Sequence, residues 1–222
     1  MTLIAPLLVV LASSAAGQGV ARGPEITQEE LAKRIAQEER TDARRDAQFR
    51  IDNGLDTLDI RPGMTVGEVG AGSGYLAFKL AARVGPRGMV IAEDISTREL
   101  GILKVRAQAK ALSNIDVIPG SPEDPKLPSD SLDMVFMHAV IKFVQQPVAL
   151  FRNIAKSLKP GGRLVLLEFE EGPRAVGLDG VPALGFRTRQ QYLELFEEAG
   201  FKVLRVDDAT LPALTIFVLG RR

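Results

Sequence analysis

Apolar and polar positions follow two alternating patterns from about residue 60 to the end of the chain. Short apolar runs bounded by Gly, Pro or Asp are typical of strands, and the amphipathic stretches between them are typical of helices. We predict strands at 64–69, 88–93, 115–118, 132–138, 162–169, 201–207 and 213–219, and helices at 75–84, 96–112, 146–158 and 188–199. Helices that alternate with strands imply an α/β fold with a parallel sheet.

The individual strands differ in how much of their surface they are expected to bury. The predicted strands 64–69, 132–138 and 162–169 are continuous apolar runs, which suit strands covered on both faces. In 201–207 polar residues alternate with apolar ones, as expected toward an edge. Residues 208–212 suit a hairpin between the last two strands. We therefore predict a doubly wound, seven-stranded, mostly parallel sheet with an antiparallel C-terminal hairpin strand.

A highly charged segment, residues 24–58, precedes this pattern. Thr27-x-x-Glu30 is a capping box that opens a helix reaching about Phe49. Glu30 and Arg34 are spaced as an i,i+4 ion pair of favourable orientation. Apolar positions in the helix are sparse, so we expect most of it to be a solvated lid or brace on the domain formed by residues 59–222.

Residues 1–23 contain one apolar run, Leu3 to Ala12, followed by small residues. Ten apolar residues are too few for a stable membrane span. An apolar core followed by small residues is typical of a secretory signal peptide, although no Lys or Arg precedes this one. We expect export to the periplasm or the exterior; the alternatives are a disordered tail and a cytoplasmic protein.

Composition removes several classes of function. The chain has 28 basic and 28 acidic residues, so its net charge offers no attraction to nucleic acid. Tryptophan is absent and aromatic residues are few, which leaves little for base stacking. The absence of cysteine excludes disulfides, thiolate-bound zinc and a cysteine nucleophile. We expect a small-molecule substrate and no nucleic-acid partner.

The most informative segment runs from Val66 to Tyr75. It reads as a strand, the acidic residue Glu68, three glycines at alternate positions (Gly70, Gly72 and Gly74) and a helix. Glycines let a backbone approach a ligand closely, and open α/β sheets bind ligands at the carboxyl ends of strands. Phosphate-binding loops use G-x-G-x-x-G, whereas this turn is E-x-G-x-G-x-G. An acid at the strand end disfavours phosphate and suits a cationic ligand.

This turn resembles motif I of the class I S-adenosylmethionine-dependent methyltransferases, and the resemblance continues in order over about residues 60–220. The other segments that resemble the family are Pro62-Gly63-Met64, Val90 to Ile95, Leu132 to Met137, Leu158 to Leu164, and Ala199-Gly200-Phe201. The resemblance implies a Rossmann-like methyltransferase domain at 59–222 and S-adenosylmethionine as its cofactor.

The resemblance also implies roles for the residues of the first two strands. The three glycines would let the turn pass the methionine portion of the cofactor, and Glu68 would bind near its amino group, often through water. Asp94 follows Gly74 by 20 residues, the distance at which an acid on the second strand reaches ribose hydroxyls. Glu93 is the rival for this role, and the family pattern favours Asp94 because its acid directly precedes an aliphatic residue.

Adenine recognition is expected after the third strand. The family commonly has Gly-Asp-Ala there, whereas this chain has Gly120-Ser121-Pro122, and proline has no N–H to donate. Ser121, Glu123 and Asp124 are the candidates, with either carboxylate accepting from the exocyclic amine. A surface turn without a ligand is the alternative.

His138, the only histidine, falls at the carboxyl end of the fourth strand, which faces the cofactor methyl in the resembled family. With a pKa near its ordinary value it would serve as a general base; the alternative is structural packing. One histidine with Glu168 or Glu170 makes a poor magnesium site, so we expect no metal. The Gly- and Pro-rich segment 170–187 and the charged helix should close the acceptor pocket, with His138 on its floor.

Taken together, the residues predict a methyltransferase that acts on a small molecule by in-line transfer, with positioning as its main source of catalysis. The alternatives are a cytoplasmic methyltransferase of quinone or lipid biosynthesis and a non-catalytic S-adenosylmethionine-binding protein.

Overall fold

The computed structural model describes residues 27–171 and 186–222. The predicted signal segment 1–23 and most of the predicted substrate loop 170–187 lie outside the described residues.

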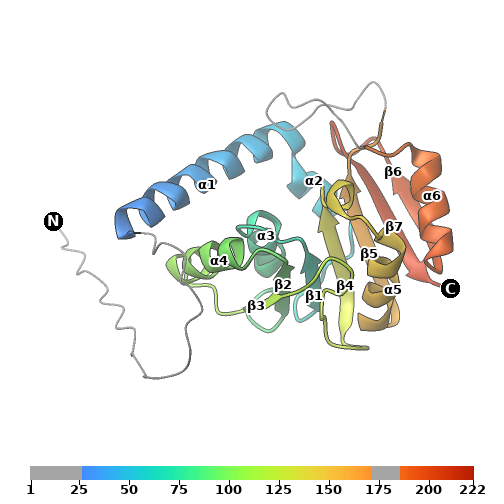
Figure 1. The fold of residues 1–222 in the computed structure, drawn as a ribbon, viewed down its shortest axis with the longest axis horizontal. Coiled ribbons are helices and arrows are strands. Elements are labelled where there is room, and N and C mark those ends of the chain that lie inside the picture. The colour runs from blue at the N-terminus through green and yellow to red at the C-terminus, as the bar shows by residue number, and fades with distance from the viewer. Residues whose placement is uncertain (1–26, 172–185) are drawn as a thin grey trace.

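Seven strands form one sheet in the order β3-β2-β1-β4-β5-β7-β6 (Figure 1). The strands are β1 Thr65–Val69, β2 Met89–Asp94, β3 Ile115–Pro119, β4 Leu132–His138, β5 Leu158–Glu168, β6 Phe201–Asp207 and β7 Thr215–Arg221. Strands β1 to β5 pair in parallel, and β7 runs antiparallel to both of its neighbours. The predicted Rossmann-like, doubly wound sheet with an antiparallel C-terminal strand is confirmed.

Helices cover both faces of the sheet, with α3 and α4 on one side and α5 and α6 on the other (Figure 1). The helical elements are α1 Gln28–Phe49, α2 Ile51–Asp56, α3 Tyr75–Val84, α4 Thr97–Ala109, the 3₁₀ turn η1 Ile141–Phe143, α5 Pro147–Ser157 and α6 Arg189–Glu198. The elements α2 and η1 were not predicted from the sequence, because each is too short to show a helical period.

The central strands supply side chains to two hydrophobic cores, one on each face of the sheet. Phe136 and Val165 belong to the core with α3, whereas Val135 and Leu164 belong to the core with α5 and α6. This alternation explains why β4 and β5 read as continuous apolar runs. Complete burial of a side chain such as Phe136 contributes about 1.5–3 kcal/mol.

The start of β5 differs from the prediction by four residues. The strand begins at Leu158 rather than at residue 162, because Leu158 pairs with Leu132 before a register shift. Residues 159–161, which the prediction left between a helix and a strand, thus form an irregular stretch within the strand.

The capping box of α1 forms as predicted. The Thr27 N–H donates to Glu30 Oε2 over 2.8 Å, and the Glu30 N–H donates to Thr27 Oγ1 over 3.2 Å. The predicted Glu30–Arg34 pair is wrong, because the Glu30 carboxylate is engaged by the cap. Arg34 instead pairs with Glu38, 2.8 Å away, and with Glu99 on α4, 3.2 Å away.

The chain order creates a switch point between β1 and β4. From β1 the chain proceeds outward to β2 and β3, then returns to place β4 on the other side of β1. Loops leaving the carboxyl ends of β1 and β4 therefore diverge and leave a crevice, where open α/β sheets bind ligands. Glu68 and His138 lie at these two strand ends.

Candidate functional site

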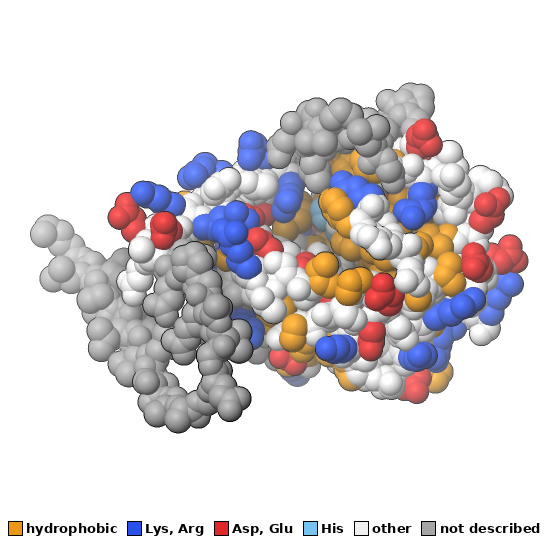
Figure 2. All heavy atoms as spheres, viewed as in Figure 1, with side chains coloured by type: hydrophobic (Ala, Val, Ile, Leu, Met, Phe, Trp, Pro, Cys, Tyr) orange, Lys and Arg blue, Asp and Glu red, His pale blue; other side chains and the backbone are white. Residues whose placement is uncertain are grey.

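A cavity of about 910 Å³ lies at the carboxyl ends of β1, β2 and β4. Its walls come from α1, the glycine turn after β1, the ends of β2 and β3, and the loop after β4. The volume is near the upper end of the usual range for ligand sites, which leaves room for a cofactor and a small acceptor. Figure 2 shows this face, with the one histidine of the chain recessed in a hollow.

The three glycines of the turn have different roles: two allow close packing, and one leaves open space in the cavity. A β-carbon on Gly70 would lie 2.4 Å from Val140, and one on Gly74 would lie 2.7 Å from Phe78, so both positions need glycine for close packing. Gly72 has φ +52° and open space where a side chain would go, and it lines the cavity. Gly70 also lines the cavity, whereas Gly74 does not. Only Gly72 thus keeps the turn open to a ligand without packing against the protein.

Two buried carboxyl groups lie in the cavity wall. In each of them, one oxygen has no hydrogen-bond partner among the described residues. Glu68 and Glu93 are each 2% exposed, and Glu68 Oε2 and Glu93 Oε1 have no hydrogen-bond partner within the described residues. Burial, with the charges of Asp94 and Glu93, raises the pKa of Glu68 well above its ordinary value. Burial and Asp94 raise the pKa of Glu93 to about 8. A cationic ligand would relieve both groups, and a phosphate would be repelled.

Asp94 connects β2 to the glycine turn. Its Oδ2 accepts the Gly72 N–H over 2.8 Å, and its Oδ1 accepts the Ser96 N–H over 2.8 Å. Each carboxylate oxygen can accept a further hydrogen bond, which suits a ribose diol beside the turn. Glu93 projects instead toward Gly120, where an added β-carbon would lie 1.9 Å from Glu93 Oε1.

The segment after β3 brings only part of the predicted adenine set to the cavity. Ser121, Pro122 and Glu123 line the cavity. Asp124 is exposed and absent from the lining, and its Oδ1 accepts the Lys126 N–H over 2.9 Å. The structure therefore does not bring Asp124 to the site, because its carboxylate caps the turn that follows.

His138 lines the cavity between two aromatic rings. Its ring centroid lies 6.4 Å from that of Phe49 and 5.7 Å from that of Tyr75. Its buried Nε2 has no hydrogen-bond partner in residues 27–171 and 186–222. Burial, then the charges of Arg45 and Lys142, lowers the pKa of His138 to about 3. The ordinary pKa assumed for a base is therefore wrong here, and the imidazole is neutral at neutral pH.

Glu168 fixes the loop that follows His138. Its Oε1 accepts the N–H groups of Val140 and Ile141 over 2.8 and 2.9 Å. Burial raises the pKa of Glu168 to about 7, although these bonds and the charge of Lys142 oppose the rise. Its observed role is to hold the loop. The described residues contain no group of three metal-ligating side chains of the His, Cys, Asp and Glu types.

Helix α1, which was expected to close the acceptor pocket, supplies a wall of the cavity with residues that were not predicted individually. Arg34, Glu38, Thr41 and Arg45 line the cavity. Their spacings of four, three and four place them on one face of the helix. This polar stripe is the sequence feature from which the cavity wall could have been predicted. A stripe of charged residues on a charged helix is usually solvated, however, so it does not by itself indicate a ligand site.

A buried network joins α1 to the glycine turn. Ser73 Oγ donates to Glu38 Oε2 over 2.7 Å, and Arg106 on α4 donates to the Ser73 carbonyl over 2.7 Å and to Asp42. Arg106 is 2% exposed, and its guanidinium also lies over the Phe78 ring. The network sets the position of the helix relative to the turn.

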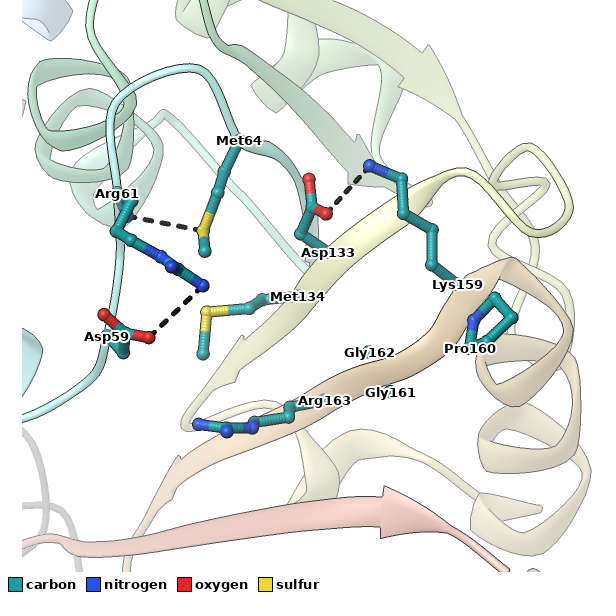
Figure 3. A pocket seen from close by; sticks show the side chains of 10 residues that line it. All are labelled: Asp59, Arg61, Met64, Asp133, Met134, Lys159, Pro160, Gly161, Gly162 and Arg163. Carbon is teal, nitrogen blue, oxygen red and sulfur yellow. Dashed lines mark hydrogen bonds and ion pairs between the residues drawn. The ribbon is translucent and has the colours of Figure 1, made fainter.

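A second hollow, of about 140 Å³, lies at the amino ends of the central strands, opposite the cavity. Figure 3 shows its lining from the starts of β4 and β5 and the segment before β1, with ion pairs between Asp59 and Arg61 and between Asp133 and Lys159. Asp133 also accepts the Thr65 N–H over 2.8 Å. These contacts join the amino ends of three strands, away from the switch point, and give this hollow a structural explanation.

Comparison with known proteins identifies the kind of domain that contains this cavity. Residues 67–166 match the family described as "Methyltransferase domain". The ubiquinone/menaquinone biosynthesis C-methyltransferase of Vibrio vulnificus is 30% identical over 118 residues, 53% of this chain and 45% of that protein. Nocamycin O-methyltransferase of Saccharothrix syringae is 32% identical over 132 residues, 55% of this chain and 47% of that protein. The chain thus spans about half the length of these relatives.

A solved structure agrees with the fold. A SAM-dependent methyltransferase from Aquifex aeolicus superimposes with a TM-score of 0.74 at 22% identity, covering 84% of this chain and 97% of that one. The family match spans the glycine turn, Asp94 and His138, which the fold brings to one cavity. Residues 67–166 thus resemble the methyltransferase domain family, and the fold around them is that of the Aquifex aeolicus SAM-dependent methyltransferase.

Proposed function

We propose that this protein transfers a methyl group from S-adenosylmethionine to a small-molecule acceptor. The observation that carries the proposal is the pair of buried, incompletely partnered carboxyl groups, Glu68 and Glu93, beside Gly72 at the switch point. A cavity with this lining suits a ligand that carries positive charge and whose chain passes close to the backbone. The same lining disfavours a nucleotide phosphate, because the phosphate is negatively charged.

The residues of the cavity fit this cofactor. Glu68 would accept from its ammonium group, Asp94 would accept from the ribose hydroxyls, and Ser121 and Glu123 would lie beside the adenine. When bound, the cofactor supplies an activated methyl group on a sulfonium. The protein then has to align the acceptor and exclude water, and positioning of this kind contributes up to about 7–11 kcal/mol.

Calorimetry of the purified protein tests the proposal. We expect S-adenosylmethionine and S-adenosylhomocysteine to bind, and NAD to bind far more weakly or not at all. Binding should release protons near neutral pH, because a cation lowers the raised pKa values of Glu68 and Glu93. Titration in two buffers of different ionisation enthalpy measures this release. Tight NAD binding without S-adenosylmethionine binding would refute the proposal.

Asp94→Asn should weaken cofactor binding by about 10- to 150-fold, the equivalent of one charge-assisted hydrogen bond. The substitution also weakens the acceptor for the Gly72 N–H. Glu93→Gln should cost less, because the proposed ribose contact does not use this group. Dissociation constants for S-adenosylhomocysteine compare the two variants. A larger loss in Glu93→Gln would mean that the ribose acid is misassigned.

His138→Ala should lower the free energy of unfolding by about 1–3 kcal/mol, because it empties a site between two aromatic rings. The depressed pKa means that the stability contributed by His138 is present above about pH 6.5 and is lost as pH falls toward 3. Denaturant melts at several pH values measure this, with turnover measured in parallel. Strongly reduced turnover with normal stability and normal cofactor affinity would restore His138 as the base. Normal turnover with normal stability would mean that His138 has neither role and that positioning of the acceptor is the remaining source of catalysis.

A second candidate is a cytoplasmic methyltransferase of quinone or lipid biosynthesis. The ubiquinone/menaquinone biosynthesis C-methyltransferase of Vibrio vulnificus favours it, through a match to about half of that protein. The first candidate carries the further proposal that residues 1–23 are a signal peptide and the protein is exported. Mass spectrometry of the mature N-terminus distinguishes them: cleavage near residues 16–17 supports export, and an intact N-terminus supports the cytoplasmic enzyme.

A further inference from the structure

The cavity has opposite charge at its two ends. Glu68, Glu93 and Asp94 line the proposed cofactor end. Arg45 and Lys142 line the cavity wall with His138: the Arg45 guanidinium lies 5.4 Å from the centroid of the Tyr75 ring, which itself lies 5.7 Å from the His138 ring. In Figure 2 basic side chains lie on both sides of the recessed histidine. The acceptor end therefore presents positive charge around a neutral imidazole.

Lys142 packs against three aromatic rings, and no acidic side chain of the described residues forms an ion pair with its ammonium group. Its Nζ lies over the rings of Phe143, Phe169 and Phe186, at 5.0, 5.4 and 5.1 Å from their centroids. Among the described residues it makes no hydrogen bond and no ion pair within 4 Å. Burial lowers the pKa of Lys142, and the charge of Glu168 only partly opposes this. A half-buried cation in this position gains most from an anionic ligand.

Arg45 provides the second cation. Its guanidinium lies 5.4 Å from the centroid of the Tyr75 ring, and its ion pair with Asp42 is long, at 3.7 Å. Asp42 makes its shorter contact with Arg106, so it neutralises Arg45 only in part. Arg34, the third basic residue in the cavity wall, is already paired with acids. Arg45 and Lys142 are thus the two cations of the wall with charge left for a ligand.

We propose that the acceptor is bound as an aromatic oxyanion, a phenolate, with Lys142 and Arg45 as its counterions. The inference rests on the proposed methyl transfer. The apolar surface beside the two cations, which includes Tyr75, Val140 and Phe143, suits the ring, and the unpartnered His138 Nε2 lies beside it.

This arrangement removes the need for a side-chain base. The two cations stabilise the ionised phenol, so its proton is lost to solvent on binding. A phenolate oxygen electron pair then forms the bond to the methyl carbon while the carbon–sulfur bond breaks and its pair returns to sulfur. A cation and an anion become two neutral products, which leave the charged site more easily than the reactants.

The probe for this proposal is 4-nitrophenol, whose ionised form absorbs visible light, added to protein saturated with S-adenosylhomocysteine. We expect the probe to bind as the phenolate, with a pKa below its value in solution, and to bind more tightly than the neutral analogue nitrobenzene. Lys142→Met should weaken phenolate binding by about 10- to 100-fold and raise the pKa of the bound probe. Lys142→Arg should retain most of the effect.

The controls separate this inference from the function on which it rests. Lys104→Met removes an exposed lysine of α4 outside the cavity and should change nothing. Lys142→Met should bind S-adenosylhomocysteine with unaltered affinity. If the unmodified protein does not bind S-adenosylhomocysteine, the methyltransferase proposal itself is refuted. If S-adenosylhomocysteine binds but nitrobenzene binds as well as the phenolate, the inference is wrong. It is equally wrong if neither Lys142→Met nor Arg45→Met weakens phenolate binding.

Discussion

Replacement of Gly72 by valine is expected to reduce S-adenosylmethionine binding by more than about 100-fold, or roughly 2.8 kcal/mol. Nothing in the protein lies within 4 Å of the position that a β-carbon would take, so the side chain would extend into open space of the cavity. The proposed cofactor would pass through that space. Calorimetry with S-adenosylhomocysteine measures the loss.

A second glycine provides a matched control for backbone strain. Gly72 has φ +52° and Gly200 has φ +85°, a region that β-branched residues rarely adopt, and both have open space around the missing side chain. Gly200 lies between α6 and β6, away from the cavity. Gly72→Val and Gly200→Val should both lose about 1–3 kcal/mol of stability, and only Gly72→Val should lose binding. Equal binding by the two variants would show that the ligand does not pass Gly72.

The parts of the fold that could be predicted are those with a local sequence signal. The ends of β4 and β6 were predicted correctly because apolar periodicity and flanking turn residues mark them. The start of β5 was not, because a Pro-Gly-Gly stretch marks a turn in most contexts and here sits inside a strand. A short helix such as α2 leaves no period to detect, and its existence depends on the core into which Ile51 and Leu55 pack.

The residues of the candidate site likewise divide into those with a local sequence signal and those placed by tertiary packing. Glu68, Gly72 and Asp94 are marked by spacing within a strand–turn–helix unit, and the structure places all three in one cavity. Arg45 reaches the same cavity from a helix that is close only in the folded chain. Burial of the histidine, which sets the pKa of His138, likewise depends on Phe49 and Tyr75 from other elements. Such effects of tertiary packing have no local signature.

Loss of the buried guanidinium in Arg106→Met should lower the free energy of unfolding by about 3–5 kcal/mol. Arg106 is 2% exposed and donates to Asp42 on α1 and to the Ser73 carbonyl in the glycine turn. Its removal leaves Asp42 partly buried without its main counterion and the Ser73 carbonyl without this donor. Chemical denaturation near neutral pH measures the change.

The comparison that makes this prediction specific is Arg98→Met, which removes an exposed arginine from the same helix. That variant should change stability by no more than about 0.5 kcal/mol. Asp42→Asn combined with Arg106→Met should recover part of the loss, because the uncompensated charge is removed with its partner. Arg106→Met should also weaken S-adenosylhomocysteine binding, since Ser73 and Glu38 lose the anchor that positions α1 beside the turn. If Arg106→Met were as mild as Arg98→Met, α1 would be held to the domain by its apolar contacts at Phe49, and the charged network would set only its orientation.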